Sequence, residues 1–191
     1  MNRLYPALSE AALASLLLIP YLLHQGKKHN TVALTTAQHI LFAVYLSTVY
    51  AVAGLPSVLY IRYRPNVNLV PFLYMFSDHT TSLLNVLLFI PLGFFLPVLW
   101  EHFRKLHRTV LWGLLISCCI EFLQIFTYRA TDINDLITNT CGTVLGYFTS
   151  MLVLKLMPAK PSDDRTIPFH RILAAVVCTM FFLQPLLRIL R

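Results

Sequence analysis

The chain has 191 residues, of which 57% are hydrophobic and only 12% are charged, and its mean hydropathy is +0.67. Water-soluble globular domains carry about 25% charged residues, so the composition argues against that class. The net charge of +7 comes from short basic clusters set between long apolar runs. Such clusters are typical of the flanks of membrane spans, so we expect membrane lipids as surroundings and no nucleic-acid partner.

Helical membrane spans need about 20 mostly apolar residues, and six segments approach this length. In chain order they are 7–23, 38–60, 82–100, 109–126, 136–154 and 172–187. The first is the weakest, since it contains Glu10 and Pro20, and we interpret it as a retained span because no small-x-small cleavage site precedes Gln25. The sequence therefore predicts an all-α polytopic membrane bundle of five to six helices, forming one domain over residues 1–191.

The distribution of lysine and arginine predicts the orientation of the spans. Nine basic residues fall in loops on one side, namely Lys27, Lys28, Arg104, Lys105, Arg108, Lys155, Lys160, Arg165 and Arg171. The other side receives six: Arg3, Arg62, Arg64, Arg129, Arg188 and Arg191. The positive-inside rule places the nine in the cytoplasm, so both termini and the turn at 128–131 are expected outside.

Ionisable residues within spans are costly and tend to face the interior of the bundle with partners. The densest polar stretch is 121–139, EFLQIFTYRATDINDLITN. Glu121 and Gln124 share one helix face, and Asp132, Asp135 and Asn139 share a face of the next helix. Two antiparallel helices joined by a tight turn would bring these side chains together at one depth.

The turn itself carries Arg129, and Thr131 or Asp132 is expected to cap the second helix by accepting backbone N–H bonds. Upstream, Asp78 and Asn85 are seven residues apart, near the start of a span broken by prolines and a glycine. We expect this helix to close the polar pocket.

Neighbouring carboxylates can divide the roles of general acid and base. The candidate catalytic residues are therefore Glu121, Asp132 and Asp135. The candidate substrate-binding residues are Arg129, Gln124, Asn139, Asp78 and Asn85. We expect no cofactor and no metal, although three carboxylates would suit a hard cation such as Mg²⁺ or Ca²⁺. Alternatively, Glu121, Arg129, Asp132 and Asp135 form a structural network of ion pairs and hydrogen bonds that fixes the turn.

Three blocks of sequence resemble the VanZ-like family of bacterial membrane proteins. They are Asn68 to Phe72 (NLVPF), Asn85 to Pro97 (NVLLFIPLGFFLP) and the segment from Glu121 to Gly146, with its pattern E-x-x-Q…R-x-x-D-x-x-D-x-x-x-N-T-x-G. The chain departs from the family pattern at Tyr128, where a glycine usually precedes the arginine, and at Asn134, where an acidic residue is usual.

The resemblance implies a multi-pass protein of the bacterial plasma membrane. The founding member is associated with low-level resistance to teicoplanin, a lipid-tailed glycopeptide, so the first hypothesis is a role in lipoglycopeptide resistance through an outward-facing acidic and arginine pocket. The partner would be a lipoglycopeptide or a lipid-linked cell-wall precursor, and a homo-oligomer is an option.

Two alternatives remain open. One is an intramembrane enzyme acting on a lipid headgroup or a lipid-linked cell-wall precursor, although the sequence has no GxSxG or HExxH motif. The other is a lipid or drug transporter, suggested by the polar residues within spans and the proline-broken helix.

Overall fold

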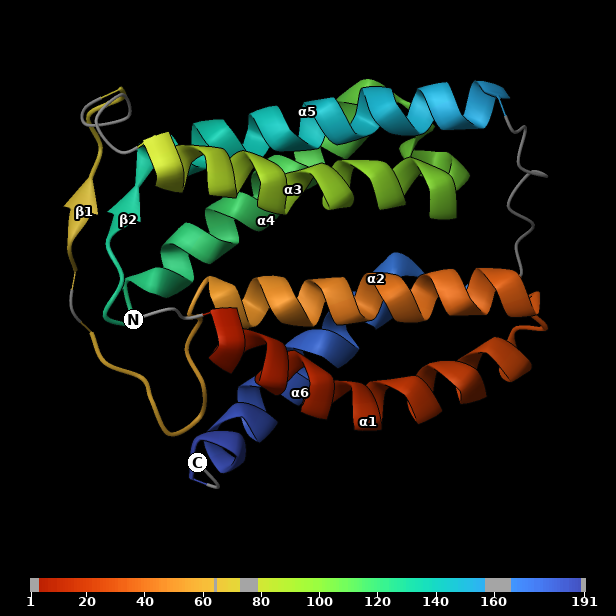
Figure 1. The fold of residues 1–191 in the computed structure, drawn as a ribbon, viewed down its shortest axis with the longest axis horizontal. Coiled ribbons are helices and arrows are strands. Elements are labelled where there is room, and N and C mark those ends of the chain that lie inside the picture. The colour runs from red at the N-terminus through yellow and green to blue at the C-terminus, as the bar shows by residue number, and fades with distance from the viewer. Residues whose placement is uncertain (1–3, 64, 73–78, 157–165, 190–191) are drawn as a thin grey trace. The chain divides into compact units, whose positions relative to one another are not determined.

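A computed structural model describes residues 4–63, 65–72, 79–156 and 166–189. In this part of the chain, α-helices predominate (Figure 1). They are α1 (Leu4–Lys28), α2 (Ala33–Val52), α3 (His79–Leu99), α4 (Leu106–Gln124), α5 (Ile133–Leu156) and α6 (Phe169–Ile189). A 3-10 helix, η1 (Glu101–Arg104), and two short strands, β1 (Val67–Asn68) and β2 (Thr131–Asp132), complete the elements.

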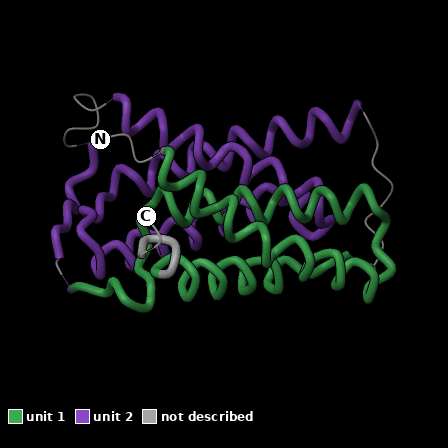
Figure 2. Tube along the Cα trace, turned by 60° about the horizontal axis from the view of Figure 1, so that its bottom comes forward, with its two compact units in different colours: residues 1–62, 163–191 green, residues 63–162 purple. Residues whose placement is uncertain are grey.

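The helices form two compact units (Figure 2). Unit 1 comprises residues 1–62 and 163–191, and unit 2 comprises residues 63–162. The first therefore contains α1, α2 and α6, and the second contains α3, α4 and α5 with both strands. The single-domain organisation remains a prediction.

In unit 1, α1 packs mainly on α2, and α6 contacts both. A buried hydrogen bond of 2.6 Å runs from Gln184 Nε2 of α6 to Glu10 Oε2 of α1. This bond satisfies a carboxylate that would be costly to leave alone within an apolar helix, so Glu10 is compatible with a membrane span. It joins helices at opposite ends of the sequence.

The prediction of an all-α helical membrane bundle is confirmed. Among the residues that the structure describes, four helices are long and apolar enough to cross a membrane: Tyr5–Lys28, His79–Leu99, Leu106–Gln124 and Ile133–Leu156. A shorter apolar helix covers Phe169–Pro185.

The second helix differs from the expected span at 38–60, because α2 begins at Ala33 and ends at Val52. Gly54 has a φ of 64°, a left-handed conformation that L side chains rarely adopt. Its N–H donates to Ala51 O, and the N–H of Leu55 donates to Tyr50 O. These two bonds form a Schellman motif, which ends the helix eight residues before the predicted boundary.

Unit 2 is held together by very close packing of α3 against α5. A Cβ atom at Gly146 would collide with Ile90 O, and one at Gly93 would collide with Thr143 O. The backbones therefore approach at these glycines, as expected for the G-x-x-x-G pair Gly142 and Gly146. This packing fixes α5, and with it the residues that begin α5, relative to α3.

Candidate functional site

Glu121 lies in the last turn of α4 and is only 7% exposed. Its Oε2 accepts a hydrogen bond of 2.8 Å from the backbone N–H of Asp132. Its backbone carbonyl accepts a second bond of 2.8 Å from the hydroxyl of Thr131. The end of α4 is thus tied directly to β2, the segment that leads into α5.

Asp132 precedes the first residue of α5 and caps that helix. Its Oδ1 accepts the N–H of Asn134 at 2.8 Å, which satisfies one of the backbone donors that a helix start leaves unpaired. The capping role predicted for Asp132 is confirmed. The same carboxylate accepts from Asn68 Nδ2 at 3.1 Å and 3.2 Å.

The segment around Asn68 reaches this site through a short parallel pairing of β1 with β2. Val67 pairs with Thr131 and Asn68 with Asp132. Further along, the N–H of Phe72 donates to Asn134 Oδ1 at 2.7 Å. Asn134, where the family usually has an acid, therefore supplies an oxygen acceptor that a carboxylate would also supply.

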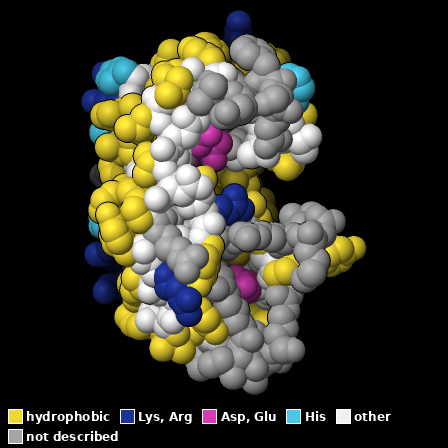
Figure 3. All heavy atoms as spheres, turned by 90° about the vertical axis from the view of Figure 1, so that its left-hand side faces the viewer, with side chains coloured by type: hydrophobic (Ala, Val, Ile, Leu, Met, Phe, Trp, Pro, Cys, Tyr) yellow, Lys and Arg dark blue, Asp and Glu magenta, His cyan; other side chains and the backbone are white. Residues whose placement is uncertain are grey.

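The charges of Asp132, Asp135 and Arg129 all act on Glu121, so each of these three groups lies within electrostatic reach of that carboxylate. We call the gathered residues the polar cluster: Asn68, Glu121, Arg129, Asp132, Asn134 and Asp135. Figure 3 looks from the side on which Figure 1 draws β1 and β2, and acidic side chains are visible there beside white atoms of the backbone and of uncharged polar side chains. Arg129 and Asp135 are half-buried, so they combine charge with partial access.

The remaining predicted site residues are not part of the polar cluster. Asn139 lies one turn deeper in α5 and donates to Ser117 of α4 at 2.9 Å. Asn85 is half-buried on α3. The backbone carbonyl of the neighbouring Val86 lies against Gly142 of α5, so Asn85 lies deeper in unit 2 than the residues that begin α5. Gln124 is buried in the last turn of α4. Asp78 falls outside the described residues.

Within the described ranges, no group of three His, Cys, Asp or Glu side chains is arranged to hold a metal ion. Two of the three carboxylates in the polar cluster accept backbone N–H bonds instead. The alternative of a hard cation on these acids therefore gains no support from the geometry. The alternative of a network that fixes the turn does gain support, because the bonds join α4, β2, α5 and the NLVPF segment.

The VanZ/LLP1 family model matches residues 13–154, which is most of the chain. The chain belongs to the VanZ/LLP1 family. It is 35% identical over 120 residues to Protein VanZ of Enterococcus faecium, an alignment that covers 62% of this chain and 73% of that protein. No solved structure gives a significant match.

In this VanZ-family chain, two of the three sequence blocks meet in the polar cluster. Asn68 opens the first block, and Glu121 and Asp132 belong to the third. The second block lies on α3 and packs against the glycines of the third. The blocks are thus neighbours in space although 64 residues separate Asn68 from Asp132.

Sequence reasoning from spacing missed Asn68, Ser117 and Asn134 as partners in this region. Their side chains are uncharged, and their contacts cross long stretches of chain, so no helical spacing pointed to them. The presence of Asn68 at the head of the NLVPF block was the one available signal. It became interpretable only once β1 was seen to pair with β2.

Proposed function

We propose that this VanZ-family protein acts at the outer leaflet of a bacterial plasma membrane and lowers susceptibility to teicoplanin and related lipid-tailed glycopeptides. The observation that carries the proposal is the meeting of two of the family's three sequence blocks in the polar cluster. Membership of the VanZ/LLP1 family and the similarity to Protein VanZ support the link to resistance. The charge bias of the loops supports an outward position for the cluster.

The chemistry of the cluster suits a ligand that carries charged or polar groups near the membrane surface. Arg129 offers a planar guanidinium, which matches the geometry of carboxylate and phosphate. Asp135 offers a carboxylate for a cationic or hydroxylated group. A lipid-tailed glycopeptide and a lipid-linked cell-wall precursor both present such groups at the outer leaflet, next to their membrane-embedded tail.

The test is expression of the chain in a teicoplanin-susceptible Gram-positive host. Minimum inhibitory concentrations are measured for teicoplanin and for a glycopeptide without a lipid tail. Wild type is expected to raise the teicoplanin value several-fold over empty vector, and Arg129→Gln is expected to lose this effect. Glu101→Gln, which removes an exposed acid from η1, serves as the control and should behave as wild type.

Unchanged teicoplanin susceptibility, with the protein detected in the membrane fraction, would remove the resistance function. An equal effect on both glycopeptides would keep resistance but reject recognition of the lipid tail. An Arg129→Gln variant that protects fully would show that resistance does not depend on the guanidinium.

The burial of Glu121 beside Asp135 favours a second candidate function, an intramembrane enzyme. A shielded carboxylate near another acid can move a proton to or from a lipid headgroup or a lipid-linked precursor. In this function Asp132 caps α5 and positions Glu121, while Arg129 orients the substrate.

The enzyme candidate is tested by incubating purified protein with lipid II and with phospholipids and comparing products by mass spectrometry. Consumption of a lipid by wild type and by Glu101→Gln, but not by Glu121→Gln, would support it. If neither lipid class is consumed by a folded protein, the enzyme function is rejected while the resistance function stands.

A further inference from the structure

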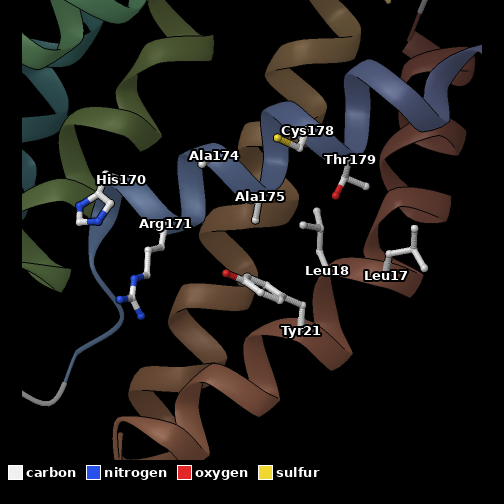
Figure 4. A pocket seen from close by; sticks show the side chains of 9 residues that line it. All are labelled: Leu17, Leu18, Tyr21, His170, Arg171, Ala174, Ala175, Cys178 and Thr179. Carbon is white, nitrogen blue, oxygen red and sulfur yellow. The ribbon is translucent and has the colours of Figure 1, made fainter. Parts of the chain in front are cut away.

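A groove between α1 and α6 of unit 1 has a volume of about 440 Å³ and is polar at one end (Figure 4). On α6, Arg171, Ala175 and Cys178 recur at i, i+4 and i+7, so they share one helix face. The small side chains of Ala175 and Cys178 hollow out this face opposite Leu18 of α1. The hydroxyl of Tyr21 lies toward Arg171, at the polar end.

The polar end carries positive charge. Arg171 Nη1 lies 3.1 Å from His29 Nε2, a contact between the chain just after α1 and the start of α6. Lys27 and Lys28 end α1, so they lie toward the same end of unit 1. Among the described residues, the contacts of the Arg171 side chain include no carboxylate. A guanidinium has five N–H donors, and the contact with His29 involves one nitrogen.

The length of the groove is similar to the thickness of the hydrocarbon layer of one leaflet. From Arg171 to Thr179 the helix rises by about 12 Å. One half of the hydrocarbon core is about 15 Å thick. An acyl chain that starts with its headgroup at Arg171 would therefore stay within the leaflet at the basic end.

We propose that this groove binds one anionic phospholipid. The phosphate lies at Arg171 and the Tyr21 hydroxyl, and one acyl chain follows the hollow over Ala175 and Cys178. Charge complementarity selects the headgroup, since basic pockets between membrane helices attract anionic lipids. The site lies in unit 1 and does not depend on the proposed function. In the orientation proposed above, the lipid belongs to the cytoplasmic leaflet.

The experiment measures lipid retained by the purified full chain in detergent, using native mass spectrometry. Phosphatidylglycerol and phosphatidylcholine with identical acyl chains are offered separately at equal concentration. Phosphatidylglycerol is expected to be retained preferentially. Arg171→Gln should reduce its retention about fivefold, as expected for one arginine beside an anionic headgroup. Arg171→Lys should retain most of the binding.

Two further variants separate the groove from general charge effects. Ala175→Trp fills the hollow and should reduce retention with the charge at Arg171 intact. Lys155→Gln, which removes an exposed basic residue of α5 in unit 2, is the matched control and should bind as wild type. Inorganic phosphate at millimolar concentration should not displace the lipid.

Several results would overturn the proposal. They are equal retention of the two lipids, no effect of Arg171→Gln, or an equal loss in Lys155→Gln. Displacement by inorganic phosphate would show that the site holds a free anion and not a lipid. Thermal unfolding of each variant is measured alongside, and a folded Arg171→Gln protein is sufficient to decide the outcome if Ala175→Trp does not fold.

Discussion

Asn68 donates its side-chain amide to both carboxylate oxygens of Asp132, at 3.1 Å and 3.2 Å, across 64 residues of sequence. The bond is charge-assisted and sits directly beside the β1–β2 pairing. It therefore fastens the NLVPF segment to the start of α5, at the place where Asp132 also caps the helix.

The hydrogen bond between Asn68 and Asp132 predicts the order in which variants at these two positions lose stability. Asn68→Ala removes a hydrogen bond to a charged group, worth about 1.5–3 kcal/mol. Asn68→Asp should destabilise the protein more than Asn68→Ala, because it places two carboxylates against each other. The double variant Asn68→Asp with Asp132→Asn should recover stability, since the donor and acceptor are exchanged and asparagine also caps helices well.

The measurement is thermal unfolding of purified protein in one detergent, with Glu101→Gln as a control for loss of an exposed acid. The interaction is refuted if Asn68→Asp is no less stable than Asn68→Ala. Failure of the double variant to recover would instead show that Asp132 must be charged to hold its other contacts.

Glu121 offers a second prediction, because its Oε2 accepts the N–H of Asp132. Glu121→Ala leaves that backbone donor without its acceptor, which costs about 1–3 kcal/mol. Glu121→Gln keeps a carbonyl oxygen at the same place and should therefore lose less stability than Glu121→Ala. Amide hydrogen exchange should rise in peptides covering residues 128–136 in the alanine variant alone.

In this test a peptide from the far end of α5, around Lys155, provides the internal control and should exchange as in wild type. Equal protection of residues 128–136 in wild type and Glu121→Ala would mean that the carboxylate does not hold β2.

The gathering of Glu121, Asp132 and Asp135 was predictable from sequence, because local helical spacing and one short turn determine it. The existence of the helices was equally predictable, since apolar runs of this length are typical of membrane-spanning helices. The end of α2 was not predictable from the sequence. The Schellman motif at Gly54 ends the helix, but the sequence stays apolar after that residue and so gives no sign of the end. The link from Asn68 to Asp132 was also inaccessible, since a two-residue strand has no pattern of its own.

The close approach of α3 and α5 makes a third prediction. Gly146→Ala places a methyl group against the backbone carbonyl of Ile90, which cannot move as a side chain can. The helices must separate, at a cost of about 1–3 kcal/mol. Thr149→Ala, at an exposed position on the same helix, is the matched control and should leave the unfolding temperature nearly unchanged.

Gly93→Ala should behave like Gly146→Ala, because it meets the carbonyl of Thr143 in the same interface. Unfolding temperatures equal to wild type for both alanine variants would mean that α3 and α5 are not in backbone contact in the protein.

The orientation on which the proposed function depends is tested by cysteine labelling in intact cells. All four native cysteines are free and exposed, so Cys118, Cys119, Cys141 and Cys178 are first replaced by alanine. A single cysteine is then placed at Ala130, an exposed position in the turn that leads into β2, or at Lys105, an exposed position between η1 and α4. A membrane-impermeant maleimide is expected to label position 130 directly and position 105 only after the membrane is opened. This expectation follows from the excess of basic residues on the side of Lys105.

The reverse pattern would place the polar cluster in the cytoplasm, and recognition of a lipid-tailed drug at the outer leaflet would then be rejected. The lipid groove between α1 and α6 would survive that result, with its ligand drawn from the opposite leaflet.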